Sequence, residues 1–68
     1  MKMTVILNTV HQNGEVEVNT WKHQELHLVD ITNLRKIFGA EVKPVGKGII
    51  SAISEIEGTK QIWTYINE

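Results

Sequence analysis

The chain has 68 residues, enough for one domain, and it contains no cysteine, so disulfides and thiolate metal sites are excluded. A domain of this size buries only about 60% of its unfolded surface, and it therefore needs a well-packed core or a partner chain. The 7 Lys and Arg residues nearly balance the 8 Asp and Glu residues, and the net charge of −1 argues against nucleic acid as a partner. The apolar runs are far too short to span a membrane.

The first residues resemble a signal peptide only briefly. Lys2 precedes the apolar run 5–7, which ends at Asn8. Because a signal peptide needs an apolar stretch of about 7–15 residues, we expect a leaderless cytoplasmic chain, or an extracellular one if the chain is cut from a longer surface protein. The glycines and the single proline stand at separate points, which is typical of one small domain spanning residues 1–68.

Two segments near the start predict a β-hairpin. Residues 3–10 are rich in β-branched side chains, and residues 15–19 alternate acids with valines, as strands do. Between them, Asn13 and Gly14 suit a two-residue type I′ turn, which needs positive φ at both central positions. That loop would place Val5, Leu7, Val16 and Val18 on one face, and Ile6, Val10 and Trp21 on the other.

The next segment predicts a short third strand and then the only helix. Residues 24–29 form the expected strand, with Leu26 and Leu28 pointing inward. Asp30 suits the helix N-cap, because its carboxylate can accept free backbone amides of the first turn. Gly39 suits the left-handed position that ends a helix. The helix would then carry one apolar stripe, made of Ile31, Leu34, Ile37 and Phe38.

A second hairpin follows the helix. Pro44 argues that the extended segment 41–45 is an edge strand or a loop, since proline cannot donate to a ladder. Residues 49–57 and 60–67 form the expected hairpin, with Gly58-Thr59 as a two-residue type II′ loop. The elements together predict an α+β fold, in which two hairpins form an antiparallel sheet with one short helix, in the order β-β-(β)-α-β-β-β.

Both faces of the second hairpin carry large apolar side chains. One face holds Ile49, Ile53, Ile62 and Ile66, and the other holds Ile50, Ala52, Ser54, Ile56, Trp63 and Tyr65. A helix of about two turns covers only one face, and we expect it over the isoleucines. The other face then packs on the first hairpin, as in a small barrel or sandwich, or binds a partner, because Trp and Tyr are enriched at binding hot spots. The candidate partner-binding residues are Trp63, Tyr65, Ile50, Ala52 and Ile56.

The polar residues show few patterns that carry chemistry. His23 and His27 would be neighbours on a helix, whereas on a strand the same spacing places them about 13 Å apart. Two carboxylate pairs have only the spacing of a solvated strand face: Glu15 with Glu17, and Glu55 with Glu57. We therefore expect no catalytic residue, no metal ligand, no cofactor and no small-molecule substrate, and we expect that the protein is not an enzyme.

Residues 28–43 read Leu-Val-Asp-Ile-Thr-Asn-Leu-Arg-Lys-Ile-Phe-Gly-Ala-Glu-Val-Lys. This segment resembles the central motif of the stalk domains related to the copper amine oxidase N-terminal domain. In that motif Leu34-Arg35 begins a short helix, Phe38-Gly39-Ala40 follows it, and Val42 lies in the next strand. The resemblance implies a small α+β module on bacterial surface proteins and some phage cell-wall hydrolases, without catalysis of its own.

Three functions follow as hypotheses. The first is a non-enzymatic protein-binding module, which self-associates through the second hairpin or binds another protein. The second is a cell-surface or cell-wall-binding accessory module of a bacterial or phage protein. The third is a small nucleic-acid-binding or phage-type regulator, in which Lys43, Lys47 and Lys60 cluster near the turns and Trp63 and Tyr65 stack on bases.

Overall fold

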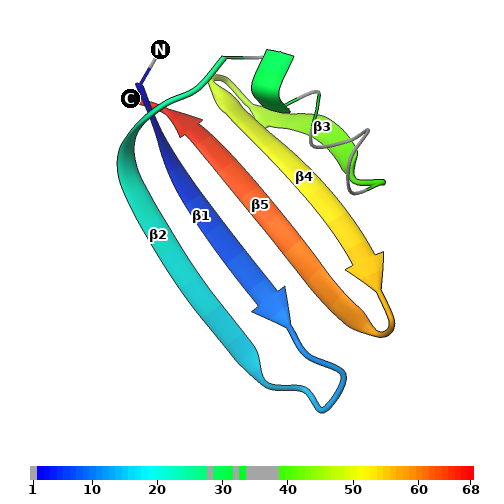
Figure 1. Ribbon diagram of the computed structural model, residues 1–68. Coiled ribbons are helices and arrows are strands. Elements are labelled where there is room, and N and C mark those ends of the chain that lie inside the picture. Colours follow the sequence, from blue (N-terminus) through cyan, green and yellow to red (C-terminus); the bar gives the residue numbers. More distant parts are fainter. Residues whose placement is uncertain (1, 28, 32, 34–38) are drawn as a thin grey trace.

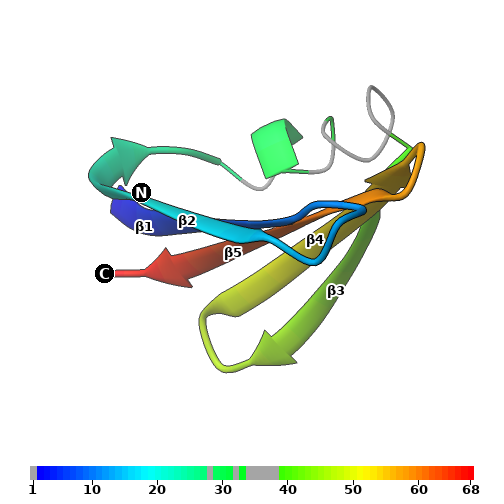
Figure 2. The ribbon, with the colours of Figure 1, turned by 90° about the horizontal axis from the view of Figure 1, so that it is seen from below.

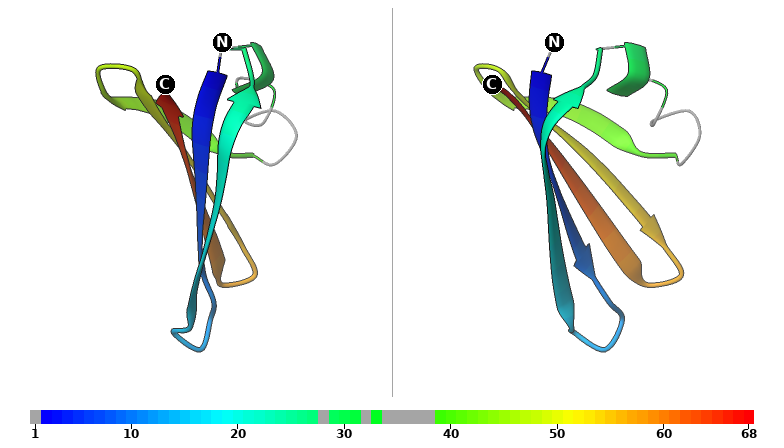
Figure 3. Two further views of the ribbon diagram at one scale, coloured as in Figure 1. Left: turned by 90° about the vertical axis from the view of Figure 1, so that its left-hand side faces the viewer. Right: turned by 60° about the vertical axis from the view of Figure 1, so that its left-hand side comes forward.

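The computed structural model describes residues 2–27, 29–31, 33 and 39–68. One antiparallel sheet of five strands dominates it, in the spatial order β2-β1-β5-β4-β3 (Figure 1). The strands are β1 (Lys2–Val10), β2 (Val16–Glu25), β3 (Glu41–Gly46), β4 (Ile49–Ile56) and β5 (Thr59–Asn67). The pairing of β1 with β5 joins the two hairpins, so both contribute to one continuous and strongly twisted sheet (Figure 3).

The predicted α+β class is wrong, because the domain is essentially all-β. The expected third strand at 24–29 does not exist as a separate element, since β2 runs without interruption to Glu25. Helical structure among the described residues is limited to 29–31 and 33. The remainder of the predicted helix, residues 32 and 34–38, and Leu28 of the predicted strand lie outside the described residues.

The helical turn begins before the predicted N-cap. The His27 N–H donates to Asp30 Oδ2 at 3.0 Å, and the Asp30 N–H donates to the His27 carbonyl at 2.9 Å. These reciprocal bonds resemble a capping box, in which an acidic side chain at the third helical position reaches back to the N-cap amide. Asp30 therefore supports the helix start from inside the first turn. Gly39 has the left-handed φ of 63° that the sequence predicted for it.

The first hairpin has a longer loop than predicted, and its faces are exchanged. The Gly14 N–H donates to the His11 carbonyl, and the His11 N–H donates to the Glu15 carbonyl. Three residues therefore separate His11 from Glu15, with Gly14 at φ 90°, as in a turn followed by a glycine bulge. One extra loop residue moves the register by one, and every side chain of β2 changes face. Val5 now pairs with Trp21, and Val10 pairs with Val16.

The second hairpin keeps its predicted faces although its loop also differs. Ile56 pairs with Thr59, so the two loop residues are Glu57 and Gly58, with φ of 51° and 79°. Positive φ at both positions is the type I′ geometry, rather than the predicted type II′ turn over 58–59. The register moves by two residues, an even number, and the two faces stay as predicted. Pro44 lies in β3 at the edge of the sheet, as predicted.

The core lies on the face with the aromatic residues, and the helical turn covers that face. Figure 2 shows the turn on one side of the sheet. The cluster of buried residues is made of Met3, Val5, Ile31, Ala40, Ala52 and Tyr65, with Leu26, Val42, Ile50 and Trp63 packed against it. The prediction that the helix covers the isoleucine face is therefore wrong. A helical stripe identifies what a helix buries, but it does not identify the face of a sheet that receives it.

Candidate functional site

A cavity of about 350 Å³ lies between the helical turn and the covered face of the sheet. We call it the aromatic pocket, and its lining residues come from β1, β2, β5 and the segment 26–31: Val5, Trp21, Gln24, Leu26, Asp30, Ile31, Trp63 and Tyr65. Its volume is at the small end of the range for ligand pockets, and its lining combines apolar walls with a few polar groups, as ligand pockets commonly do.

Two tryptophans form one wall of the aromatic pocket. Val5 pairs with Trp21 on one side and with Tyr65 on the other, so the three side chains lie on the same face of adjacent strands. Leu7 pairs with Trp63 one step further along β1. The Trp21 and Trp63 rings stack with their centroids 6.3 Å apart and their planes at 17°, within the range of favourable aromatic pairs. Trp21 keeps 42% of its surface exposed, so this wall is open to solvent.

Tyr65 also lines the aromatic pocket, and only 3% of its surface is exposed. Burial raises the pKa of Tyr65 to about 12, because desolvation disfavours the charged phenolate. The side chain is therefore neutral over the whole range in which the protein is handled. Tyr65 contributes an apolar ring and a polar hydroxyl to the pocket. Among the other described lining residues, Asp30 alone has an ionisable side chain.

The five predicted partner-binding residues have different fates. Trp63 and Tyr65 line the aromatic pocket. Ala52 is fully buried at 0% exposure, and Ile50 packs against the core. Ile56 is 58% exposed beside the hairpin loop and does not join the others. The structure thus brings two of the five together at a cavity.

Sequence reasoning missed three important residues of the pocket. The predicted two-residue loop places Trp21 on the opposite face, whereas the observed loop has three residues. Asp30 and Ile31 belong to the predicted helix, but the prediction places that helix over the other face. The only sequence signal that favours Trp21 is the alternation along β2, and this signal requires the correct loop length to be read.

The opposite face of the sheet carries many aliphatic side chains and lies away from the helical turn. We call it the isoleucine face, and its aliphatic residues are Ile6, Val10, Val16, Val18, Ile49, Ile53, Ile62 and Ile66. None of them belongs to the core cluster. Val16 and Val18 are each 60% exposed, and the isoleucines are partly exposed. Short polar side chains, such as Thr64 and Asn8, lie among them.

Charges on the isoleucine face occur as opposite pairs. Lys43 Nζ lies 3.0 Å from Glu41 Oε1 on β3. Lys60 of β5 stands directly opposite Glu55 of β4, in a cross-strand pair. Lys2 likewise stands opposite Glu25. Because each of these bases faces an acid, the face carries little net charge at these positions, and it offers no basic stripe of the kind that binds nucleic acid.

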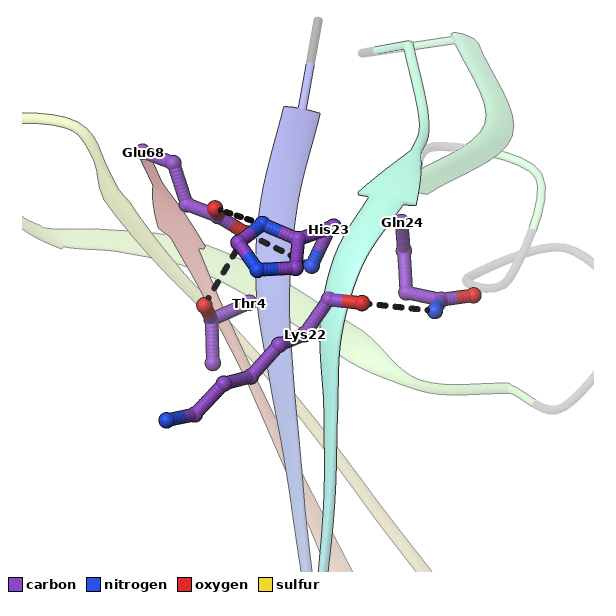
Figure 4. A network of polar contacts seen from close by, with 5 residues as sticks. All are labelled: Thr4, Lys22, His23, Gln24 and Glu68. Atoms are coloured by element: carbon purple, nitrogen blue, oxygen red, sulfur yellow. Dashed lines mark hydrogen bonds and ion pairs between the residues drawn. The ribbon is translucent and has the colours of Figure 1, made fainter.

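A polar network closes one end of the isoleucine face (Figure 4). β2 contains a β-bulge, because its two residues Lys22 and His23 lie opposite the single residue Thr4 of β1. His23 has a left-handed φ of 59° at this bulge. This conformation turns the His23 N–H toward Glu68, whose Oε2 accepts it at 2.7 Å. The Thr4 hydroxyl donates to the same oxygen at 3.1 Å, and His23 Nδ1 lies 2.6 Å from Oε1.

These contacts explain the acidity of Glu68. The backbone hydrogen bond from His23 lowers the pKa of Glu68 most, and the Thr4 hydroxyl and the His23 ring lower it further. His23 therefore has a structural role, since both its backbone N–H and its ring contact Glu68. The described residues contain no group of three or more acidic, His or Cys side chains that could hold a metal ion. His11 Nε2 lies 3.1 Å from Glu17 Oε1 in an exposed pair near the first loop.

No family model matches the chain, and no curated protein or solved structure matches it either. The resemblance to the stalk domains therefore rests on its motif alone. Within the described residues, no helix is long and apolar enough to cross a membrane.

Proposed function

We propose that the protein is a non-enzymatic binding module that self-associates through the isoleucine face. The observation that carries this proposal is an aliphatic surface on four of the five strands, β1, β2, β4 and β5, that contributes nothing to the core cluster. Large apolar patches of this kind on small domains mark interaction sites, because burying them against a partner removes apolar surface from water. The predicted interface on the second hairpin is thereby moved from its aromatic face to its isoleucine face.

The total surface of the chain also supports a partner. Its accessible area is 4790 Å², whereas a compact monomer of 7.7 kDa is expected to expose about 4,300 Å². An excess of roughly a tenth means that the chain exposes more surface than is usual for its mass. A second layer on the isoleucine face would bring the ratio of buried to exposed surface into the ordinary range.

A second copy of the chain fits this face better than a charged partner does. The pairing of Lys43 with Glu41 and of Lys60 with Glu55 leaves no unbalanced field there, so two copies meet without like-charge repulsion. Two sheets can pack face to face about 10 Å apart with interdigitating side chains. The four strands that carry the face have 8 to 10 residues each, and together they give an area of about 600 Å². This area is at the low end for specific interfaces, and we expect micromolar association.

Sedimentation equilibrium tests the proposal directly. The wild-type chain should pass from monomer to dimer between micromolar and hundreds of micromolar concentrations. Val18→Lys places a charge on the isoleucine face at an exposed position, and we expect it to weaken association at least tenfold. Val29→Lys is the matched control, because Val29 is 67% exposed on the helical turn over the other face. It adds the same charge and should leave association unchanged.

Circular dichroism of both variants verifies that each keeps its sheet. A wild-type chain that stays monomeric at millimolar concentration would refute self-association. Equal weakening by Val18→Lys and Val29→Lys would show that association does not use the isoleucine face.

A further inference from the structure

The aromatic pocket lies on the face that self-association leaves free, and its chemistry is specific enough to define a ligand class. Trp21, Trp63 and Tyr65 present aromatic surface to the cavity. The electron-rich faces of aromatic rings attract cations, most strongly when the ring is Trp, and groups of such rings recognise quaternary ammonium compounds. An apolar ligand of any charge would fit the walls, so the preference between ligand classes is decided by the charged group in the lining.

Asp30 provides that charged group. It lines the aromatic pocket, and its carboxylate is held in place by the hydrogen bond from the His27 N–H to Oδ2. The hydrogen bond to Oδ2 thus fixes the side chain. Among the described residues, Oδ1 accepts no hydrogen bond. No Lys, Arg or His is among the residues that line the cavity. The described lining therefore carries one negative charge and no compensating positive one.

We propose that the aromatic pocket binds a small organic cation, namely an alkylated ammonium compound with an apolar body. The cation would lie against the Trp21 and Trp63 rings near the Asp30 carboxylate, with its alkyl groups on Val5, Leu26 and Ile31. The volume of about 350 Å³ is large enough for a free small molecule, and cavities of this size bury most of the surface of their ligands. This inference is independent of self-association, because it concerns the opposite face of the sheet.

Intrinsic fluorescence provides a direct measurement, because the chain has only 2 Trp residues and both line the pocket. Titration with choline should change the emission in a saturable manner. The neutral isostere 3,3-dimethylbutan-1-ol has the same shape with carbon in place of the ammonium nitrogen. We expect choline to bind about tenfold more tightly than this alcohol, since only the cation gains from the rings and the carboxylate.

Two variants separate the contributions of charge and aromatic surface. Asp30→Asn retains an oxygen that can accept from the His27 N–H, and it should lower the preference for choline to about threefold. Trp21→Leu keeps an apolar side chain at a partly exposed position, and it should likewise lower the preference for choline to about threefold. Glu15→Gln is the control for charge, because Glu15 lies in the first hairpin loop away from the pocket and its loss should change nothing.

Three outcomes would overturn the proposal. They are equal affinity for choline and the alcohol, an unchanged preference in Asp30→Asn, and the absence of saturable binding by either compound. A peptide carrying trimethyllysine provides a further comparison. If it binds at least tenfold more tightly than choline, the pocket recognises a modified protein side chain and the assignment to a free small molecule is wrong.

Discussion

The two faces of this sheet have similar aliphatic content but very different surroundings. The covered face places Tyr65 and Ala52 beneath the helical turn and leaves a cavity beside Trp21. The isoleucine face has a broader aliphatic surface and no share in the core cluster. A single short helical turn cannot bury the apolar side chains of both faces, and it lies over the face with the aromatic residues. The comparison indicates that one face stabilises the monomer and that the other is free to stabilise an assembly.

We expect the largest loss of stability from a substitution that removes packing on the covered face. Ile31 has 2% of its surface exposed and docks the helical turn on the sheet. Ile31→Ala should lower the free energy of unfolding by about 3 kcal/mol, because it removes buried methylene groups and leaves a cavity. Urea denaturation measures the change. A loss below about 1 kcal/mol would mean that the turn contributes little to the core.

The same truncation on the isoleucine face should have a smaller and concentration-dependent effect. Ile62 lies on β5 and is only partly exposed, so we expect Ile62→Ala to lower the stability of the dilute monomer by about 1 kcal/mol. At high protein concentration the difference from wild type should grow, since binding to the native state adds stability by mass action. Thermal unfolding at two concentrations measures both values. A difference that does not change with concentration would contradict an assembly on this face.

The smallest effect concerns the polar network at the end of the isoleucine face. The hydrogen bond from the His23 N–H holds the pKa of Glu68 below its ordinary value, so the folded state binds this proton less readily than the unfolded state. The stabilisation is therefore complete above the ordinary pKa of glutamate and is lost as the pH falls through the lowered one. Glu68→Gln should remove this part of the acid dependence. Melting temperatures at pH 7 and pH 3 measure it, with Glu15→Gln as control, and identical pH profiles for the two variants would refute it.

The sequence predicted both hairpins and the apolar faces of the second one. Alternation along residues 49–56 and 59–67 survives an error of two residues in the register, because a strand repeats every two residues. In the first hairpin, the error in the predicted register is one residue, and it exchanges the two faces of β2. Asn13-Gly14 is typical of a two-residue loop, but the His11 carbonyl accepts from Gly14 and the loop has three residues. The predicted register is therefore wrong by one residue and places Trp21 on the other face. For this reason the sequence did not predict the aromatic pocket.

The fold class could not be read from local patterns for a different reason. Residues 24–25 continue β2 through a bulge at which His23 adopts a left-handed φ that side chains rarely favour. Glu68 stabilises this conformation from a position far away in the sequence. No local signal near His23 reports that contact, so the continuous strand was divided into two. The aromatic pocket is equally non-local, since it joins β1, β2, β5 and the helical turn.

The central ladder between β1 and β5 has a consequence for the order of folding. Met3 pairs with Asn67 and Val10 with Lys60, so every contact of this ladder joins residues from opposite ends of the domain. Each hairpin closes a short loop and can form early, whereas the ladder must close nearly the whole chain. During synthesis on a ribosome, β1 and β2 emerge long before β5 is available. The edge of β1 that later receives β5 is therefore unpaired in the nascent chain, and this edge is the segment most exposed to wrong strand pairing.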